Sequence, residues 1–230
     1  MVPDPTPAND FEAVVTTDLG VFRFSFDADK APKHVEQFLS LARQGYFDGS
    51  AFFHVVANGM IQGGDPLLKD PKTDRKLWGS GGLNLIPSEV SSLKHERGAI
   101  SAARIPGKPD SDGAQFFVVL YPQPSLDGQY SVFGHMTEGI EVAQKISQVP
   151  VAADGMTETP VRILKVTIEN KKTEPFLNAT TDELRRTVTL KTRSGPSKSK
   201  WSPTGRRTTC AISSSSSRQG GMMAPHSTGW

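Results

Sequence analysis

Short apolar runs separated by turns dominate residues 10–170 and limit what this part of the chain can fold into. The runs are rich in β-branched and aromatic residues, as strands are. They cover residues 11–17, 21–26, 52–56, 60–63, 98–102, 115–120, 131–135 and 161–169. The first two flank Asp18-Leu19-Gly20, which predicts a hairpin turn. Many short strands with few helices avoid exposed edges best in a closed sheet, so the pattern predicts a mostly β, closed antiparallel barrel.

Two segments have helical periodicity instead. The first begins at Ala31-Pro32, with proline in the first turn, and runs to about Gln44 before Gly45 stops it. Its apolar residues lie on one face, which leaves His34 on the face expected to be exposed. The second covers residues 139–147. The two helices are expected to cap the ends of the barrel.

Charge and cysteine content exclude several classes of protein. Residues 171–230 carry 11 Lys/Arg and 3 Asp/Glu, a net charge of +8, so residues 1–170 carry about −6. An acidic body does not suit binding to a nucleic acid backbone. The single cysteine, Cys210, excludes an internal disulfide and a cysteine zinc cluster. No run of about 18 apolar residues occurs. We expect a cytoplasmic protein, or a periplasmic or secreted one if a signal peptide was removed, with a flexible N-terminal segment over 1–9.

The C-terminal segment, 171–230, differs from the rest in composition. Residues 193–230 have no acidic residue, ten serines and few aliphatic residues, which predicts a disordered basic tail. However, residues 187–192 followed by Gly195 resemble residues 14–20 at the start of the domain. Two interpretations stay open: a basic Ser-rich tail, or a truncated second copy of the domain whose reading frame is lost near Arg193.

Four groups of motifs follow one another in a fixed order. They are Gly-Tyr-Phe-Asp-Gly at 45–49 with Phe-Phe-His-Val-Val at 52–56, Met-Ile-Gln-Gly-Gly-Asp at 60–65, Gly-Ala-Ile-Ser-Ala-Ala at 98–103 with Gly-Ala-Gln-Phe-Phe at 113–117, and Leu-Asp-Gly-Gln-Tyr at 126–130 with Phe-Gly at 133–134. Each group alone is weak. In this order and at these separations, residues 10–170 resemble the cyclophilin-type peptidyl-prolyl cis/trans isomerases, particularly bacterial ones. The resemblance implies an eight-stranded antiparallel barrel capped by two α-helices.

The activity that the resemblance implies is rotation about X–Pro peptide bonds in peptides and folding proteins. Amide resonance gives this rotation a barrier of about 18–20 kcal/mol. The reaction needs an apolar socket for the proline ring, a donor that weakens the resonance, and polar groups that hold the moving carbonyl. We expect no cofactor and no metal. The expected partners are proline-containing peptides or unfolded protein segments, without membrane or nucleic acid, and the expected state is a monomer.

The resemblance also assigns roles to individual residues. Phe117, Met60 and Leu126 fall where the family binds the proline ring, and Gln62 where it bonds the substrate backbone. The remaining substrate-binding positions are Ala103, Ile105, Gln115 and Tyr130. His54 and Gln62 are the predicted catalytic residues.

Two positions depart from the family pattern. Counting back from Gln62 puts His54 where the family has its catalytic arginine, and Gly59 where it has an aromatic residue of the socket. A second alignment puts Val55 at the arginine position, and neither supplies an arginine. We therefore expect weak isomerase activity that rises as the pH falls from 8 to 6. The alternative is a proline-peptide-binding module without turnover.

The other ionisable residues form no recognisable site in the sequence. His95 and His135 lie in or near predicted turns, and Asp65 and Asp112 lie in loops without the spacing of metal ligands. We expect all four to be solvated surface residues.

Overall fold

The computed structural model describes residues 7–105, 107–108, 110–171, 188–192 and 195–199. The chain divides into two compact units, Met1–Lys172 and Thr173–Trp230. Among the described residues, no helix is both long and apolar enough to cross a lipid bilayer.

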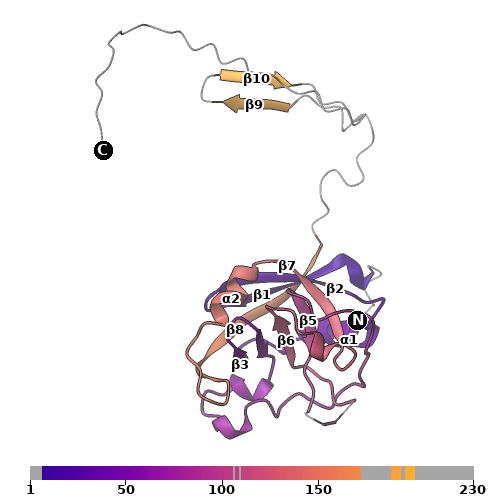
Figure 1. The fold of residues 1–230 in the computed structure, drawn as a ribbon, viewed down its shortest axis with the longest axis vertical. Helices are drawn as coiled ribbons and strands as arrows, with labels where there is room; N and C mark the ends of the chain where they lie inside the picture. The colour runs from indigo at the N-terminus through magenta and orange to yellow at the C-terminus, as the bar shows by residue number, and fades with distance from the viewer. Residues whose placement is uncertain (1–6, 106, 109, 172–187, 193–194, 200–230) are drawn as a thin grey trace, which may run out of the picture. The chain divides into compact units, whose positions relative to one another are not determined.

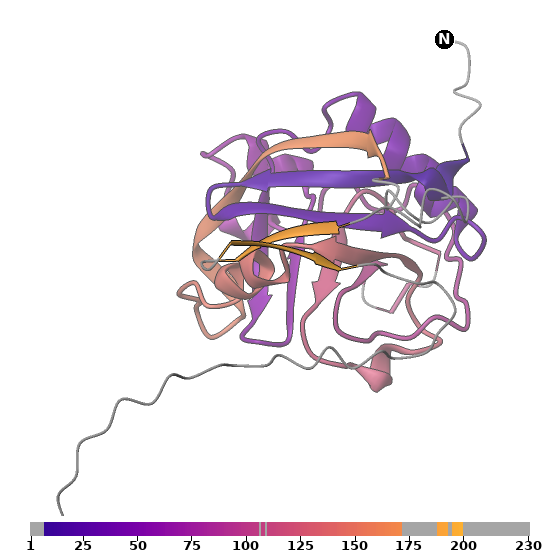
Figure 2. The same ribbon diagram turned by 90° about the horizontal axis from the view of Figure 1, so that it is seen from above.

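The first unit is a closed antiparallel barrel, which confirms the predicted fold (Figure 1). Its strands are β1 (Phe11–Thr17), β2 (Gly20–Phe26), β3 (Ala51–Val56), β4 (Met60–Gly63), β5 (Ala99–Ala102), β6 (Phe116–Val119), β7 (Val132–Glu138) and β8 (Met156–Asn170). Around the barrel the order is β1-β2-β7-β5-β6-β4-β3-β8. The long strand β8 pairs with both β1 and β3 and so closes the sheet (Figure 2).

The turn between β1 and β2 depends on a glycine. Thr17 pairs with Gly20 across the two intervening residues, and the Thr17 hydroxyl donates to the Gly20 carbonyl at 2.8 Å. Gly20 has φ +135°, and a Cβ there would lie 2.9 Å from Cγ2 of Val142 on helix α2 (Ile140–Ile146). A side chain at this position would be strained by its backbone and would meet that helix.

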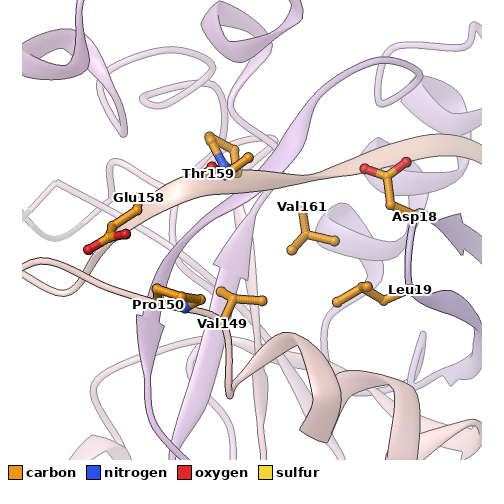
Figure 3. A pocket seen from close by; sticks show the side chains of 8 residues that line it. Asp18, Leu19, Val149, Pro150, Glu158, Thr159 and Val161 are labelled. Atoms are coloured by element: carbon orange, nitrogen blue, oxygen red, sulfur yellow. The ribbon is translucent and has the colours of Figure 1, made fainter.

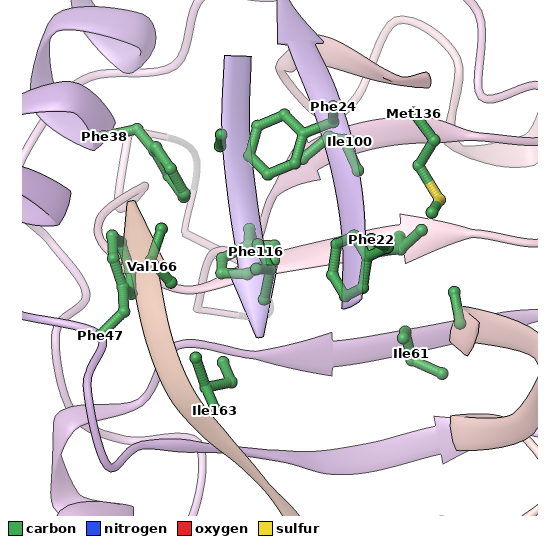
Figure 4. Close-up of a cluster of buried hydrophobic side chains, with 14 of the residues drawn as sticks. Phe22, Phe24, Phe38, Phe47, Ile61, Ile100, Phe116, Met136, Ile163 and Val166 are labelled. Carbon is green, nitrogen blue, oxygen red and sulfur yellow. The ribbon is translucent and has the colours of Figure 1, made fainter. Parts of the chain in front are cut away.

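The barrel interior is filled by aromatic and branched side chains (Figure 4). Helix α1 (Pro32–Arg43) contributes Phe38 to this core. The Phe38 ring lies 4.7 Å from that of Phe47, 5.2 Å from Phe24 and 5.6 Å from Phe116, centroid to centroid. The last two contacts are edge-to-face, the arrangement that aromatic pairs prefer. The helix is thereby anchored to strands on different parts of the barrel.

His34 is buried at 3% exposure, so its expected exposure is wrong. Its Nδ1 lies 2.7 Å from Glu89 Oε2 and its Nε2 lies 2.9 Å from Asp112 Oδ2. Asp112, also expected on the surface, has 0% exposure and accepts from Ser131 Oγ at 2.8 Å. The helical pattern could not reveal this, because the polar face of α1 is covered by segments more than 50 residues away in the sequence.

The stretch between β4 and β5 is ordered by short 3₁₀ turns, Pro66–Lys69 and Arg75–Leu77. Asp65 begins it and is fully buried, which corrects its expected exposure. Its Oδ1 accepts from the Leu67 amide at 2.8 Å and its Oδ2 from the Gly79 amide at 2.6 Å. Asp65 therefore closes a loop that returns residues 78–79 to the barrel wall.

Both predicted flexible ends lie partly outside the described residues. In the N-terminal segment, Ala8–Asp10 form a 3₁₀ turn, and Asn9 Oδ1 accepts from the Ala28 amide at 2.8 Å. In the second unit, β9 (Val188–Thr192) and β10 (Gly195–Ser199) form an antiparallel hairpin. Thr192 pairs with Gly195, the same register across two residues as Thr17 with Gly20.

Candidate active site

A groove of about 360 Å³ lies on the outer face of the barrel, beside strands β3, β4 and β6. It is lined by Phe53, His54, Met60, Gln62, Trp78, Gly79, Ala103, Arg104, Phe117, Leu126, Tyr130 and Met156. Seven of the nine residues that the sequence assigned to the site therefore lie together: His54, Met60, Gln62, Ala103, Phe117, Leu126 and Tyr130. Their individual roles stay predictions.

Strand alternation places the apolar part of the groove. Phe116 points into the barrel core, so the next residue, Phe117, points outward and packs in a separate cluster with Met60, Leu126 and Tyr130. The Tyr130 ring meets Phe117 edge to face at 5.7 Å. We call Met60, Phe117 and Leu126 the proline socket, after the role that the family resemblance implies for them. Their shared outward face gives the chain an apolar concavity outside its core.

His95 supports the socket from beneath. Its ring is stacked on that of Phe117 at 5.9 Å and is 2% exposed, so its expected exposure is wrong. Nδ1 lies 3.1 Å from Asp127 Oδ1, and Nε2 lies 3.1 Å from Ser101 Oγ. Burial lowers the pKa of His95, although Asp127 opposes this. Ser101 is fully buried, and its hydroxyl donates to the Ser131 carbonyl at 3.1 Å. The hydrogen-bonded series Asp127, His95 and Ser101 therefore positions Phe117 and presents no nucleophile to the groove.

A pair of glutamines forms the polar edge of the groove. Gln62 lies opposite Phe117 across β4 and β6, and its Nε2 donates to Gln115 Oε1 at 3.0 Å. Gln115 is 1% exposed and donates to the Gly81 carbonyl at 2.6 Å. Gln115 thus lies behind Gln62 and holds its amide, and does not line the groove itself.

A β-bulge turns His54 toward the groove. Phe52 pairs with Gly63 and His54 pairs with Gln62, so the register shifts between them and Phe53 is the extra residue. Val55 is 2% exposed and belongs to the barrel core. The structure therefore places His54 beside Gln62 and turns Val55 inward, which favours the alignment that puts His54 at the arginine position.

The His54 imidazole is half-buried and lacks a partner at one nitrogen. Nδ1 is buried and has no hydrogen bond within the described part of the chain. Nε2 lies against Gly155, where a Cβ would approach it to 2.8 Å. Burial lowers the pKa of His54, and the nearby Asp154 charge offsets this only in part. The lowered pKa favours the neutral ring at pH 7, which has a single N–H to donate.

Five residues that line the groove were missed by the sequence analysis: Trp78, Met156, Arg104, Phe53 and Gly79. Arg75 holds the first two, since its Nη2 donates to Asp154 Oδ1 and to the Met156 carbonyl, each at 3.1 Å, and its guanidinium lies 5.6 Å from the Trp78 ring. No local pattern in the sequence singled out Trp78.

Two other positions that the sequence analysis singled out, Ile105 and Gly59, are not among the residues that line the groove. Ile105 is half-buried, and its amide donates to Ser111 Oγ at 2.9 Å. Gly59 is buried in the turn between β3 and β4, where its carbonyl accepts from the Leu120 amide at 2.7 Å. A Cβ at Gly59 would lie 2.9 Å from Val56 Cγ1. The turn is therefore tight, and the aromatic residues beside His54 are instead Phe53 and Trp78.

A second hollow of about 280 Å³ lies between the β1–β2 turn and the start of β8 (Figure 3). Its ionisable residues are Asp18 and Glu158. Asp18 already accepts from the Arg162 amide at 2.9 Å. The hollow therefore has fewer polar side chains free to bind a ligand than the groove has. No cluster of three or more metal-ligating side chains occurs among the residues that the structure describes.

Comparisons with known proteins agree with this architecture. Residues 13–168 match the family model of the cyclophilin type peptidyl-prolyl cis-trans isomerases. The chain is 30% identical over 162 residues to a peptidyl-prolyl cis-trans isomerase-like protein 1 of Neurospora crassa, covering 68% of this chain and 93% of that protein. It is 37% identical over 145 residues to a probable peptidyl-prolyl cis-trans isomerase of Brucella abortus, covering 61% and 74%.

Solved structures show the same likeness. A cyclophilin type isomerase of Cryptosporidium parvum superposes with a TM-score of 0.61 at 26% identity, covering 70% of this chain and 98% of that one. A second crystal structure of that protein, determined in the presence of the dipeptide Ala-Pro, gives a TM-score of 0.60.

Proposed function

Because the chain belongs to the cyclophilin-type peptidyl-prolyl cis-trans isomerase family, we propose that it accelerates cis–trans isomerisation of X–Pro bonds at reduced rate. The observation that carries this is the proline socket lying directly beside Gln62, whose amide is held by buried Gln115. The substrates would be proline-containing peptides and unfolded protein segments. One crystal structure of the Cryptosporidium relative was determined in the presence of the dipeptide Ala-Pro, which contains an X–Pro bond.

Catalysis here is binding of the twisted bond. The proline ring enters the socket and stays fixed, while the preceding carbonyl swings out of the plane that amide resonance prefers. One Nε2 hydrogen of Gln62 is donated to Gln115. The second Nε2 hydrogen stays available and can bond to this carbonyl as it moves. A groove that fits the twisted form better than either planar form lowers the barrier. No nucleophile or proton relay is required.

The weak point of the site is the donor for the prolyl nitrogen. A neutral imidazole at His54 offers one N–H, where a guanidinium would offer a charged fork. Removal of one preorganised donor typically lowers a rate by about 10²–10³-fold. The proposed isomerase is therefore slower than a member with arginine at this position.

The neutral His54 also favours a second candidate function, a module that binds proline segments without turnover. Both functions need the socket, and only isomerisation needs the donor. The experiment is NMR exchange between the cis and trans forms of a short Ala-Pro-Phe peptide, with the full chain and with Phe117→Ala. Catalysed exchange that Phe117→Ala abolishes supports the isomerase. Peptide shifts without catalysed exchange support the binding module. The absence of both peptide shifts and catalysed exchange would overturn both functions.

A further inference from the structure

The groove contains one permanent positive charge and no carboxylate among the described residues that line it. The charge belongs to Arg104, just beyond the end of β5. Asp154, the acid whose charge acts on His54, is already paired with Arg75 at 3.1 Å. Asp127 bonds His95 beneath the socket. The positive charge in the groove is therefore not neutralised by either of these acids.

The Arg104 side chain is held by its contact with Tyr130, and one of its donors has no partner in the described part of the chain. Its guanidinium lies over the Tyr130 ring, 4.5 Å from the centroid, and its Nε is buried without a hydrogen-bond partner in the described part of the chain. Two other guanidinium groups are paired: Arg23 donates to Glu169 at 2.8 Å, and Arg162 donates to the Gly49 carbonyl at 3.2 Å. Buried donors are normally satisfied, so an unpaired donor on a residue that lines the groove indicates a ligand acceptor.

The position of this charge limits which part of a bound peptide it can meet. Tyr130 contacts both the guanidinium and, edge to face, the Phe117 ring of the socket. The charge therefore lies one side chain away from the bound proline ring. Residues of an extended peptide are about 3.3–3.6 Å apart, so the side chain of a residue adjacent to the proline spans this distance.

The chemistry of the guanidinium favours an anion over a neutral carbonyl. A guanidinium placed over the Tyr130 ring by a cation–π contact keeps its charge and carries N–H donors along its edge. A carboxylate matches such an edge with two parallel hydrogen bonds, and the half-buried, apolar surroundings strengthen the attraction.

We propose that Arg104 makes the groove selective for proline peptides that carry an acidic residue next to the proline. This inference rests on the proposed function for the place of the proline ring, and it adds the class of substrate. The orphaned guanidinium is the group that reads the flanking side chain. A lysine at the same peptide position meets like charge and is rejected.

The test compares three peptides, Ala-Glu-Pro-Phe, Ala-Gln-Pro-Phe and Ala-Lys-Pro-Phe, acetylated and amidated so that no terminal charge contributes. Binding to the full chain is measured by NMR shift titration at low salt. We expect the Glu peptide to bind about tenfold more tightly than the Lys peptide, the size of one charge-assisted contact, with Gln between them. High salt should reduce the difference, because ions screen a half-exposed pair.

Variants separate this contact from general charge. Arg104→Gln should bring the Glu and Lys peptides within about twofold of each other, whereas Arg104→Lys should keep the order with a smaller ratio, since the charge stays and the fork is lost. Lys108→Gln is the matched control, because it removes an exposed cation of the same loop that does not line the groove. It should leave the preference unchanged.

The outcomes distinguish this inference from the function on which it rests. Equal binding of the Glu and Lys peptides, or a preference that survives Arg104→Gln, would overturn the role of Arg104 while catalysed exchange of the Gln peptide still supports the isomerase. A Glu preference that depends on Arg104 without catalysed exchange of any peptide supports the selectivity and overturns turnover. Absence of binding by all three peptides would overturn both.

Discussion

Gln62 donates from Nε2 to Oε1 of Gln115 over 3.0 Å, so the polar residue at the edge of the groove is held by a buried partner. Gln115 is held in turn by the Gly81 carbonyl at 2.6 Å. The conformation of the groove therefore depends on a residue with 1% exposure, which does not line the groove itself.

Gln115→Leu should lower kcat/KM for an Ala-Pro peptide by about tenfold, because one hydrogen bond worth roughly 1–1.5 kcal/mol no longer orients Gln62. The loss should appear mainly in kcat, since the proline socket is unchanged, and NMR exchange at several peptide concentrations separates the two constants. Gln44→Leu is the control, because Gln44 is exposed and its side-chain amide donates to Ser40 near the end of α1, away from the groove. Equal activity of Gln115→Leu and the unaltered chain would contradict the positioning role.

The activity should depend on pH through His54, in a lower window than an ordinary imidazole would give. A free imidazole would raise activity between pH 8 and 6, but burial lowers the pKa of His54 below its usual 6.5. We therefore expect a flat profile from pH 8 to about 6.5 and a rise below it, as the ring gains a second N–H and a charge. His54→Gln should remove the rise. A profile that is unchanged by this substitution would show that His54 takes no part.

Stability should move in the opposite direction over the same pH range. The folded pKa values of His54 and His95 are both lowered, chiefly by burial, so the unfolded chain binds more protons as the pH falls through 6.5. Stability is then lost on acidification. Burial raises the pKa of Glu89, but hydrogen bonds from His34 and Lys33 outweigh burial and leave this pKa lowered. The stability that depends on ionised Glu89 is therefore lost only at a lower pH.

Thermal melts at pH 7.5, 6.5 and 5.5 measure this dependence. The melting temperature should fall across the series. His54→Gln should reduce the fall, because it removes one of the two histidines whose folded pKa is lowered. A melting temperature that rises from pH 7.5 to 5.5 would contradict the sign. A fall that is equally steep in His54→Gln would assign the effect to other groups.

The barrel could be predicted from local patterns, whereas the groove residues were predicted from the family resemblance. Strand alternation then turns Phe116 into the core and Phe117 into the groove. The turn at Gly20 and the start of α1 at Pro32 follow from residue chemistry alone. The turn and the helix start depend on neighbours within a few residues, so they can be predicted from the sequence alone.

Features that depend on distant segments could not be predicted in this way. The burial of His34 arises from Glu89 and Asp112, which reach the helix from two separate loops. The bulge that turns His54 outward is set by pairing with β4, and Arg104 enters the groove by stacking on Tyr130. Such long-range contacts leave no periodic signal in the chain.

The hairpin of β9 and β10 supports a prediction about the gene. Its register, Thr192 opposite Gly195, matches that of Thr17 opposite Gly20, which agrees with the proposal that a second copy of the domain begins there. Sequencing the nucleic acid across the codon for Arg193 should reveal another frame that encodes cyclophilin-like residues downstream. Absence of such a frame would leave 171–230 as a basic Ser-rich tail.

The most direct test of the central claim is catalysed cis–trans exchange of an Ala-Pro-Phe peptide by the full chain and by His54→Arg. The account predicts slow but measurable catalysis by the unaltered chain. It predicts an increase of about 10–100-fold in His54→Arg, because a charged fork then stands beside Gln62. No exchange in either protein would contradict the claim that this groove isomerises X–Pro bonds.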